Sequence, residues 1–131
     1  MHAIHVLLID DDPIQAHLVR AHLSRAPHRR YELSWAASLA AAAETLGRAT
    51  FDVILLDLML PDGRELEAYQ RVAALAPDVP VLLLSGLEDL DTVLSVIRAG
   101  ADDFLAKEDA DARRIELRIH VILARRERAA E

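Results

Sequence analysis

The sequence predicts a three-layer α/β sandwich, in which helices cover both faces of a mostly parallel, five-stranded sheet. Strand-like and helix-like patterns alternate along all 131 residues, which is typical of parallel strands joined by crossover helices. Several strands are continuous apolar runs rather than alternating ones, which indicates that both sheet faces are buried. In such sheets ligands bind beyond the carboxyl ends of the strands, so the residues that follow each strand are the candidate ligand-binding residues.

The first half of the chain predicts three strands and two helices. Strand 4–9 precedes Pro13, which suits a first helical turn because its missing N–H is not needed there. The helix that follows has an apolar stripe and ends near Pro27; the stripe is Ile14, Leu18, Val19 and Leu23. Residues 31–36 alternate and predict a strand near the sheet edge. The next helix lies between a Ser38 cap and Gly47, and strand 51–57 follows it.

The second half predicts two strands and three helices. The expected elements are a helix over 64–76, a strand over 81–84, a helix over 88–99 closed by Gly100, a strand over 103–106 and a helix from 110 to the end. Pro77 and Pro80 bracket the turn before the fourth strand.

Carboxylates gather where the strands end. Asp10, Asp11 and Asp12 follow the first strand, and Asp57 ends the third. Ser85 and Lys107 follow the fourth and fifth strands. Because parallel strands end at one edge, several negative charges meet there, which is costly unless a cation joins them. A divalent cation beside a carboxylate is what phosphoryl transfer to an aspartate requires.

Four motifs in order resemble the receiver domain of a bacterial two-component response regulator. They are Leu7 to Pro13, Asp52 to Gly63, Pro80 to Gly86, and Gly100 to Lys107. The resemblance runs from residue 4 to about residue 124. It implies a flavodoxin-like strand order of 2-1-3-4-5 and a phosphorylation-dependent signalling switch, with no enzymatic activity beyond the domain's own phosphorylation and slow dephosphorylation.

The resemblance also implies a role for each motif residue. Asp57 would accept a phosphoryl group from a sensor histidine kinase or a histidine phosphotransfer protein. Mg²⁺ would be held by Asp10, Asp11, Asp57 and the backbone carbonyl of Met59. Ser85 would bond a phosphoryl oxygen, Lys107 would pair with Asp57 or the phosphoryl group, and Phe104 would act as a packing switch. Asp12 is expected to cap the first helix, and Gly86 completes the Ser85 motif.

The chain departs from the family pattern at a few positions. Glu108 replaces the proline that usually follows the lysine, so the Lys107 loop is less rigidly set. Phe104 stands where many receivers carry tyrosine, so this position has no hydroxyl. Met59 and Leu87 are apolar where the family often has polar residues that position a hydrolytic water. We therefore expect a long-lived phosphorylated form.

Composition limits the classes of partner that the protein could bind and the cellular compartments in which it could be found. A net charge of −7 disfavours direct binding of nucleic acid. The absence of cysteine excludes disulfides and thiol chemistry, and six unclustered histidines disfavour a histidine metal site. No apolar run approaches the roughly 20 residues of a membrane helix, and no secretion signal is recognisable. We expect a cytoplasmic protein.

Residues 1–124 are expected to form the receiver domain, and residues 125–131 a helical extension that leads to an output domain absent from this chain. The last two helices carry apolar residues on more than one side. This pattern fits either a homodimer through these helices or two broadly buried helices, and the sequence leaves both open.

Other functions on this pattern are a Mg²⁺-dependent phosphohydrolase, a binding module that has lost the chemistry, and a flavin carrier. A hydrolase of the haloacid dehalogenase type needs a longer chain with a cap segment. The retained Asp57 and Lys107 disfavour a chemically inert module. A flavin phosphate would be repelled by the three acids after the first strand.

Overall fold

A computed structural model describes residues 2–86 and 89–130. Five parallel strands form one sheet in the order β2-β1-β3-β6-β7, which is the predicted order 2-1-3-4-5 for the five long strands. The strands are β1 (Ile4–Ile9), β2 (Tyr31–Ala36), β3 (Val53–Leu56), β6 (Val81–Ser85) and β7 (Asp103–Ala106). The alternating strand β2 lies at the sheet edge, as its pattern predicts.

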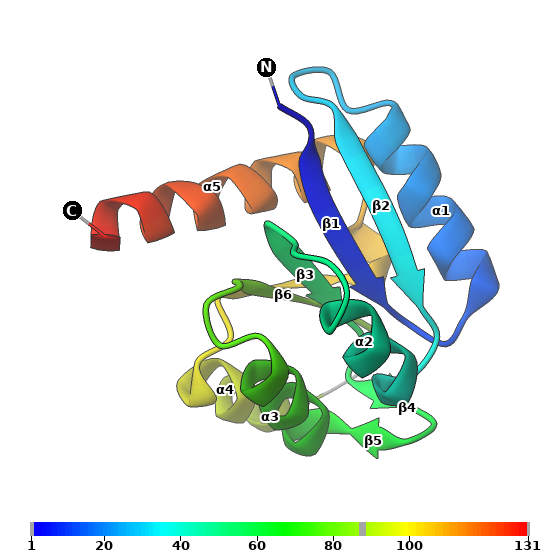
Figure 1. Cartoon of the computed structure of the whole chain (residues 1–131), viewed down its shortest axis with the longest axis vertical. Coiled ribbons are helices and arrows are strands. Elements are labelled where there is room, and N and C mark those ends of the chain that lie inside the picture. The colour runs from blue at the N-terminus through cyan, green and yellow to red at the C-terminus, as the bar shows by residue number, and fades with distance from the viewer. Residues whose placement is uncertain (1, 87–88, 131) are drawn as a thin grey trace.

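Five α-helices cover the sheet (Figure 1). They are α1 (Pro13–Ser24), α2 (Leu39–Leu46), α3 (Glu65–Leu75), α4 (Leu90–Ala99) and α5 (Ala112–Ala130). One apolar cluster joins α2, α3 and α4 to the sheet, and a second joins α1 and α5 to it. The two clusters lie on opposite sides of the strands, so the three predicted layers are confirmed.

The apolar stripe predicted for α1 is partly wrong. Val19 and Leu23 are buried, but Ile14 is 71% exposed and Leu18 is 45% exposed. At about 100° per residue, Ile14 and Leu18 lie on the side of the helix opposite to Val19 and Leu23. The sheet-facing ridge takes Ala16 instead, which is 5% exposed. Two apolar ridges were therefore merged into one stripe in the prediction.

Two further features differ from the predicted elements. Regular strand geometry in β3 covers only Val53–Leu56, because Asp52 and Asp57 each join β1 by a single backbone bond, to His5 O at 2.8 Å and to Ile9 O at 2.9 Å. A short hairpin, in which β4 (Met59–Leu60) pairs with β5 (Gly63–Arg64), lies between the predicted strand 51–57 and the predicted helix 64–76 and includes Arg64, which was expected to be helical. Strands this short show no recognisable periodicity.

A buried carboxylate connects α5 to the segment before β2. Glu116 is 4% exposed and accepts hydrogen bonds from Tyr31 Oη at 3.0 Å and from the His28 backbone N–H at 3.3 Å. His28 Nδ1 lies 2.9 Å from the same carboxylate and donates when it carries the proton. Burial raises the pKa of Glu116, but these hydrogen bonds together lower it by more than burial raises it, so the net shift of the pKa is downward.

The sequence places a helical extension at residues 125–131, and α5 runs without a break to Ala130. Within residues 2–86 and 89–130, none of the helices combines the length and the apolar character that crossing a bilayer requires.

Candidate functional site

Three aspartates converge at the carboxyl end of the sheet. Asp10 follows β1 and Asp57 follows β3, and both are buried, at 0% and 4% exposure. Asp11 is exposed beside them. One carboxylate oxygen from each of the three lies within 4.8 Å of the others. The sequence-predicted cluster of Asp10, Asp11 and Asp57 is therefore present in space.

Strand register explains this convergence. Ile9 of β1 pairs with Leu56 of β3, so the next residue on each strand, Asp10 and Asp57, must lie side by side. Backbone bonds fix both positions: Asp10 N–H donates to Ala36 O at 3.1 Å, and Asp57 N–H donates to Ile9 O at 2.9 Å. The buried apolar strands thus hold two carboxylates at one place with little freedom.

Lys107 supplies the opposing charge. Ser85 of β6 pairs with Ala106 of β7, so Lys107 is the first residue past the fifth strand. Its Nζ lies 3.0 Å from Asp57 Oδ2 and 3.0 Å from Asp10 Oδ2. Lys107 begins a short 3₁₀ turn, Lys107–Asp109. With Glu108 in place of proline, the lysine still reaches both carboxylates.

Burial and neighbouring charges shift the pKa values of Asp10 and Lys107. Burial raises the pKa of Asp10 and the Asp57 charge adds to the rise, whereas the Asp12 backbone N–H and Lys107 oppose it. Burial lowers the pKa of Lys107, but the two carboxylates raise it more, so its pKa lies above the usual value. The hydrogen bonds from the Asp12 amide and from Lys107 therefore offset only part of the burial penalty on a charged Asp10.

The residues present fit Mg²⁺. Asp10 Oδ2 is buried and, apart from the Lys107 ammonium, meets no donor in the described part of the chain. Three carboxylates with at least one under-satisfied oxygen form the hard, oxygen-only ligand set that Mg²⁺ prefers. Asp10, Asp11, Asp57 and the carbonyl of Met59 are the groups that would hold the ion.

The remaining predicted residues lie around the acids. Ser85 is buried, and its hydroxyl donates to Asp57 Oδ1 at 3.3 Å, while the Met59 backbone N–H donates to the same oxygen at 3.1 Å. Phe104 is half-buried against the core on the α3 side of the sheet. Asp12 caps α1 by accepting a hydrogen bond from Ile14 N–H at 2.9 Å.

The described contacts do not explain the residues at two of the predicted positions, Gly86 and Leu87. A β-carbon on Gly86 would meet no described atom within 4 Å, so crowding does not explain this glycine. Leu87 lies outside the described residues.

Sequence reasoning missed one residue at this edge. Trp35 Nε1 donates to the backbone carbonyl of Asp10 at 2.6 Å, which joins the end of β2 to the acidic cluster. Trp35 is the only tryptophan in the chain. Its signal was available, because it stands next to the last residue of β2 at the same sheet edge as the acids.

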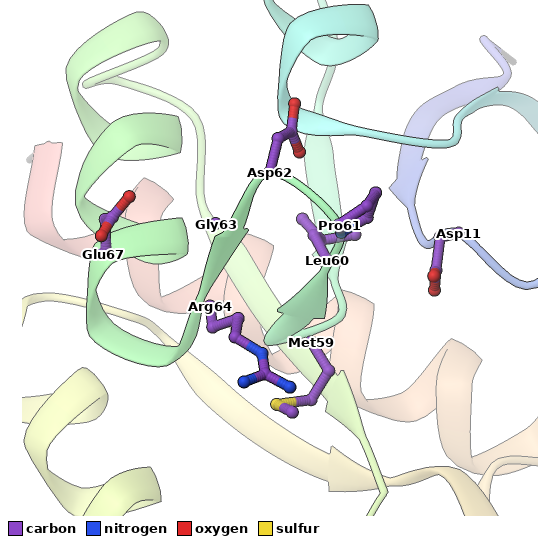
Figure 2. A pocket seen from close by; sticks show the side chains of 8 residues that line it. All are labelled: Asp11, Met59, Leu60, Pro61, Asp62, Gly63, Arg64 and Glu67. Carbon is purple, nitrogen blue, oxygen red and sulfur yellow. The ribbon is translucent and has the colours of Figure 1, made fainter.

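A cavity of about 740 Å³ opens beside the acids. Figure 2 shows it between the β4–β5 hairpin, the start of α3 and the loop after β1. Its lining residues are Asp11, Met59, Leu60, Pro61, Asp62, Gly63, Arg64 and Glu67. Asp11 belongs to both the cavity lining and the acidic cluster, and Met59, which also lines the cavity, donates its backbone N–H to Asp57, so the cavity gives solvent access to the site.

Comparisons with known proteins agree with this geometry. The family model described as "Response regulator receiver domain" matches residues 6–120. Response regulator protein PilR of Pseudomonas aeruginosa is 35% identical over 101 residues, which are 77% of this chain and 22% of PilR. The probable transcriptional regulatory protein TcrX of Mycobacterium tuberculosis is 29% identical over 120 residues, 92% of this chain and 50% of TcrX.

A solved structure supports the fold. A response regulator receiver domain protein (CheY-like) from Methanospirillum hungatei JF-1 superposes with a TM-score of 0.84 at 23% identity, covering 98% of this chain and 99% of that one. This chain spans half or less of the length of PilR and TcrX. The match over residues 6–120, together with the acidic cluster at the strand ends, shows that the chain belongs to the response regulator receiver domain family.

Proposed function

We propose that the domain is a phosphorylation-dependent signalling switch in which Asp57 accepts a phosphoryl group from a phosphohistidine, with Mg²⁺ bound. The donor is a sensor histidine kinase or a histidine phosphotransfer protein. The observation that carries the proposal is the cluster of Asp10, Asp11 and Asp57 next to an open cavity, with Lys107 paired to Asp10 and Asp57. On this proposal the domain catalyses only its own phosphorylation and slow dephosphorylation.

The transfer follows from the positions of these side chains. An Asp57 carboxylate oxygen attacks phosphorus, the P–N bond of the phosphohistidine breaks, and its electron pair returns to the imidazole, which then takes up a proton. Asp10, Asp11 and Asp57 would hold Mg²⁺, whose positive charge would neutralise charge on the transferring group. Lys107, now paired with Asp57, can turn to a phosphoryl oxygen. The Ser85 hydroxyl can donate to another such oxygen from its place 3.3 Å from Asp57 Oδ1.

The same contacts offer a route for output. Ser85 and Phe104 lie on the neighbouring strands β6 and β7, so a new partner for the Ser85 hydroxyl can alter the packing of Phe104. The change would pass to α4, which follows β6, and to α5, which follows β7. It would reach a further domain or a partner through these helices.

A homodimer through the last two helices is part of the proposal. On α4 only Val96 is fully buried, and Leu90 is 72% exposed. Leu90 lies on the same face of α4 as the half-buried Val93, Leu94 and Ile97, and a continuous apolar face of this kind favours a partner surface. Leu117 of α5 is 58% exposed but lies with Pro27 and His28 on the side of α1, so the dimer surface rests mainly on α4. Sedimentation with beryllofluoride tests it, and an unchanged mass contradicts it.

Intact mass measurement tests the central proposal. The protein is incubated with acetyl phosphate or a phosphohistidine donor, with and without Mg²⁺. We expect a Mg²⁺-dependent gain of one phosphoryl group, which Asp57→Ala abolishes. Turnover of a phosphomonoester would instead support a hydrolase, and no gain with either donor would indicate a binding module that keeps only the fold.

The lifetime of phospho-Asp57 is a separate prediction. Met59 is 38% exposed at the site, and an apolar side chain there cannot orient a nucleophilic water. We therefore expect slow dephosphorylation, which Met59→Asn together with Leu87→Glu should accelerate. An increase of the decay rate by less than about threefold rejects this explanation, since that corresponds to well under 1 kcal/mol of barrier.

A further inference from the structure

One cationic side chain lines the cavity beside the acidic cluster. The ionisable groups of the lining are Asp11, Asp62, Glu67 and Arg64, so Arg64 is the only Lys or Arg among the described lining residues. The chain as a whole carries a net charge of −7. An anionic phosphoryl donor that approaches through this cavity would meet repulsion from every charged group except Arg64.

Strand register places Arg64 close to the phosphoacceptor. In the β4–β5 hairpin Arg64 pairs directly with Met59, so the two side chains share one face with Cβ atoms about 5 Å apart. Met59 is two residues past Asp57 and donates its backbone N–H to Asp57 Oδ1 at 3.1 Å. In Figure 2 the Arg64 guanidinium lies beside the thioether of Met59. Only one side chain therefore separates Arg64 from the Asp57 loop.

Arg64 is available, unlike other cations near the site. Lys107 is held between Asp10 and Asp57, and Arg71 donates to the Asp62 carbonyl at 2.7 Å. Arg64 is exposed, and within residues 2–86 and 89–130 its guanidinium forms no ion pair and no side-chain hydrogen bond. An unpaired guanidinium can bind two phosphoryl oxygens at once through its planar N–H groups.

We propose that Arg64 is a donor-positioning residue that binds the phosphoryl oxygens of an incoming dianionic phosphodonor and holds them toward Asp57. The inference rests on the proposed phosphoacceptor function and adds a residue to it. The ligand class is a phosphoryl group on a good leaving group, such as an acyl phosphate or a phosphohistidine. Arg64 acts from outside the Mg²⁺ ligand set, so its contribution is to donor binding and not to ion binding.

The test is phosphorylation by acetyl phosphate in saturating Mg²⁺, followed by intact mass as donor concentration is varied. We expect Arg64→Ala to lower the apparent second-order rate by about two- to fivefold, because an exposed charge contact contributes at most about 1 kcal/mol. Most of the loss should be in the half-saturating donor concentration. Arg64→Lys should recover part of the rate, and added salt should reduce the difference between wild type and Arg64→Ala.

Two measurements separate positioning from indirect effects. Arg113→Ala removes the same charge from an exposed residue at a different cavity, lined also by Pro27 and His120, and should leave the rate unchanged. The Mg²⁺ affinity of Arg64→Ala, followed by Trp35 fluorescence, should be unchanged or tighter.

Three results would overturn the inference. They are an Arg64→Ala rate equal to wild type, an equal loss in Arg113→Ala, or a loss explained by weaker Mg²⁺ binding. A wild-type chain that gains no phosphoryl group overturns the proposed function as well, so the two failures are distinguishable.

Discussion

Replacing Lys107 with methionine should destabilise the protein in the absence of divalent ions. The ammonium lies 3.0 Å from both Asp10 Oδ2 and Asp57 Oδ2, and both acids are almost fully buried. Breaking a buried ion pair by removing one partner costs about 3–5 kcal/mol. The Lys107 side chain is 23% exposed, so water can partly replace it. We therefore expect the free energy of unfolding to fall by about 2–3 kcal/mol.

The same substitution should strengthen the binding of Mg²⁺. On the proposed function, Lys107 and Mg²⁺ would compete in the wild type for the carboxylates of Asp10 and Asp57, because like charges repel at short range. Removing the ammonium should tighten Mg²⁺ binding by roughly tenfold, which corresponds to about 1.4 kcal/mol. Saturating Mg²⁺ should consequently restore much of the lost stability.

The stability loss in Lys107→Met should depend on pH. The folded pKa of Asp10 is raised above 3.8, chiefly by burial, so its folded form binds a proton more readily than the unfolded chain. An acid with a raised pKa destabilises the fold at neutral pH, and this cost is relieved as pH falls through the folded pKa. Loss of Lys107 enlarges the cost, so mild acidification should recover more stability in Lys107→Met than in wild type.

Urea unfolding in excess chelator, followed by circular dichroism, measures the loss of unfolding free energy in Lys107→Met. Titration of Trp35 fluorescence measures Mg²⁺ binding, because the indole donates to the Asp10 carbonyl. A change in unfolding free energy under about 0.5 kcal/mol, which is typical of an ordinary surface substitution, would refute the reasoning. Weaker Mg²⁺ binding in the variant would refute it independently.

Two further predictions concern the scaffold. Glu116→Gln should lower the unfolding free energy by about 1 kcal/mol at pH 7. Because the folded pKa of Glu116 is depressed below 4.5, this contribution is present above pH 4.5 and is lost as pH falls through the folded pKa. If urea unfolding shows the same free-energy difference between wild type and Glu116→Gln above pH 4.5 and below the folded pKa, the assignment is contradicted. Glu65→Gly should raise the unfolding free energy by about 0.5–1 kcal/mol, because Glu65 has φ 55° where glycine carries no steric cost. A lower melting temperature for Glu65→Gly would count against the steric argument.

Strand-end reasoning predicted the acidic cluster because parallel strands impose it. Once β1 and β3 are recognised as neighbours, the residues that follow them must meet, whatever the loops do. The same logic predicted where Ser85 and Lys107 lie, and Glu108 does not disturb the result. The roles of these residues in phosphoryl transfer remain predictions, since geometry fixes their positions and not their chemistry.

Features that depend on long-range side-chain contacts were not predictable. Glu116 meets His28 and Tyr31 across separations of 88 and 85 residues, and no local pattern pairs a helix acid with a distant loop. Asp62 likewise accepts from Leu39 N–H and Ala40 N–H, both at 2.9 Å, and so caps the start of α2 from the hairpin. Asp62-Gly63 is a turn signal, but nothing in it names the helix it caps.

The charge balance of the site explains why phosphorylation should require a divalent ion. The site gathers three carboxylates, Asp10, Asp11 and Asp57, and the Lys107 ammonium pairs with two of them, Asp10 and Asp57. A phosphoryl group brings further negative charge to Asp57, and Lys107 cannot serve Asp10, Asp57 and the phosphoryl oxygens equally. Without a divalent cation, Lys107 could reach a phosphoryl oxygen only by moving away from Asp10. The buried Asp10 carboxylate would then lose its neutralising charge, which is costly where water is excluded. On the proposed function, an ion bound to the acids would release Lys107 to follow the phosphoryl group, so the cation that compensates the acids would also free the lysine to respond.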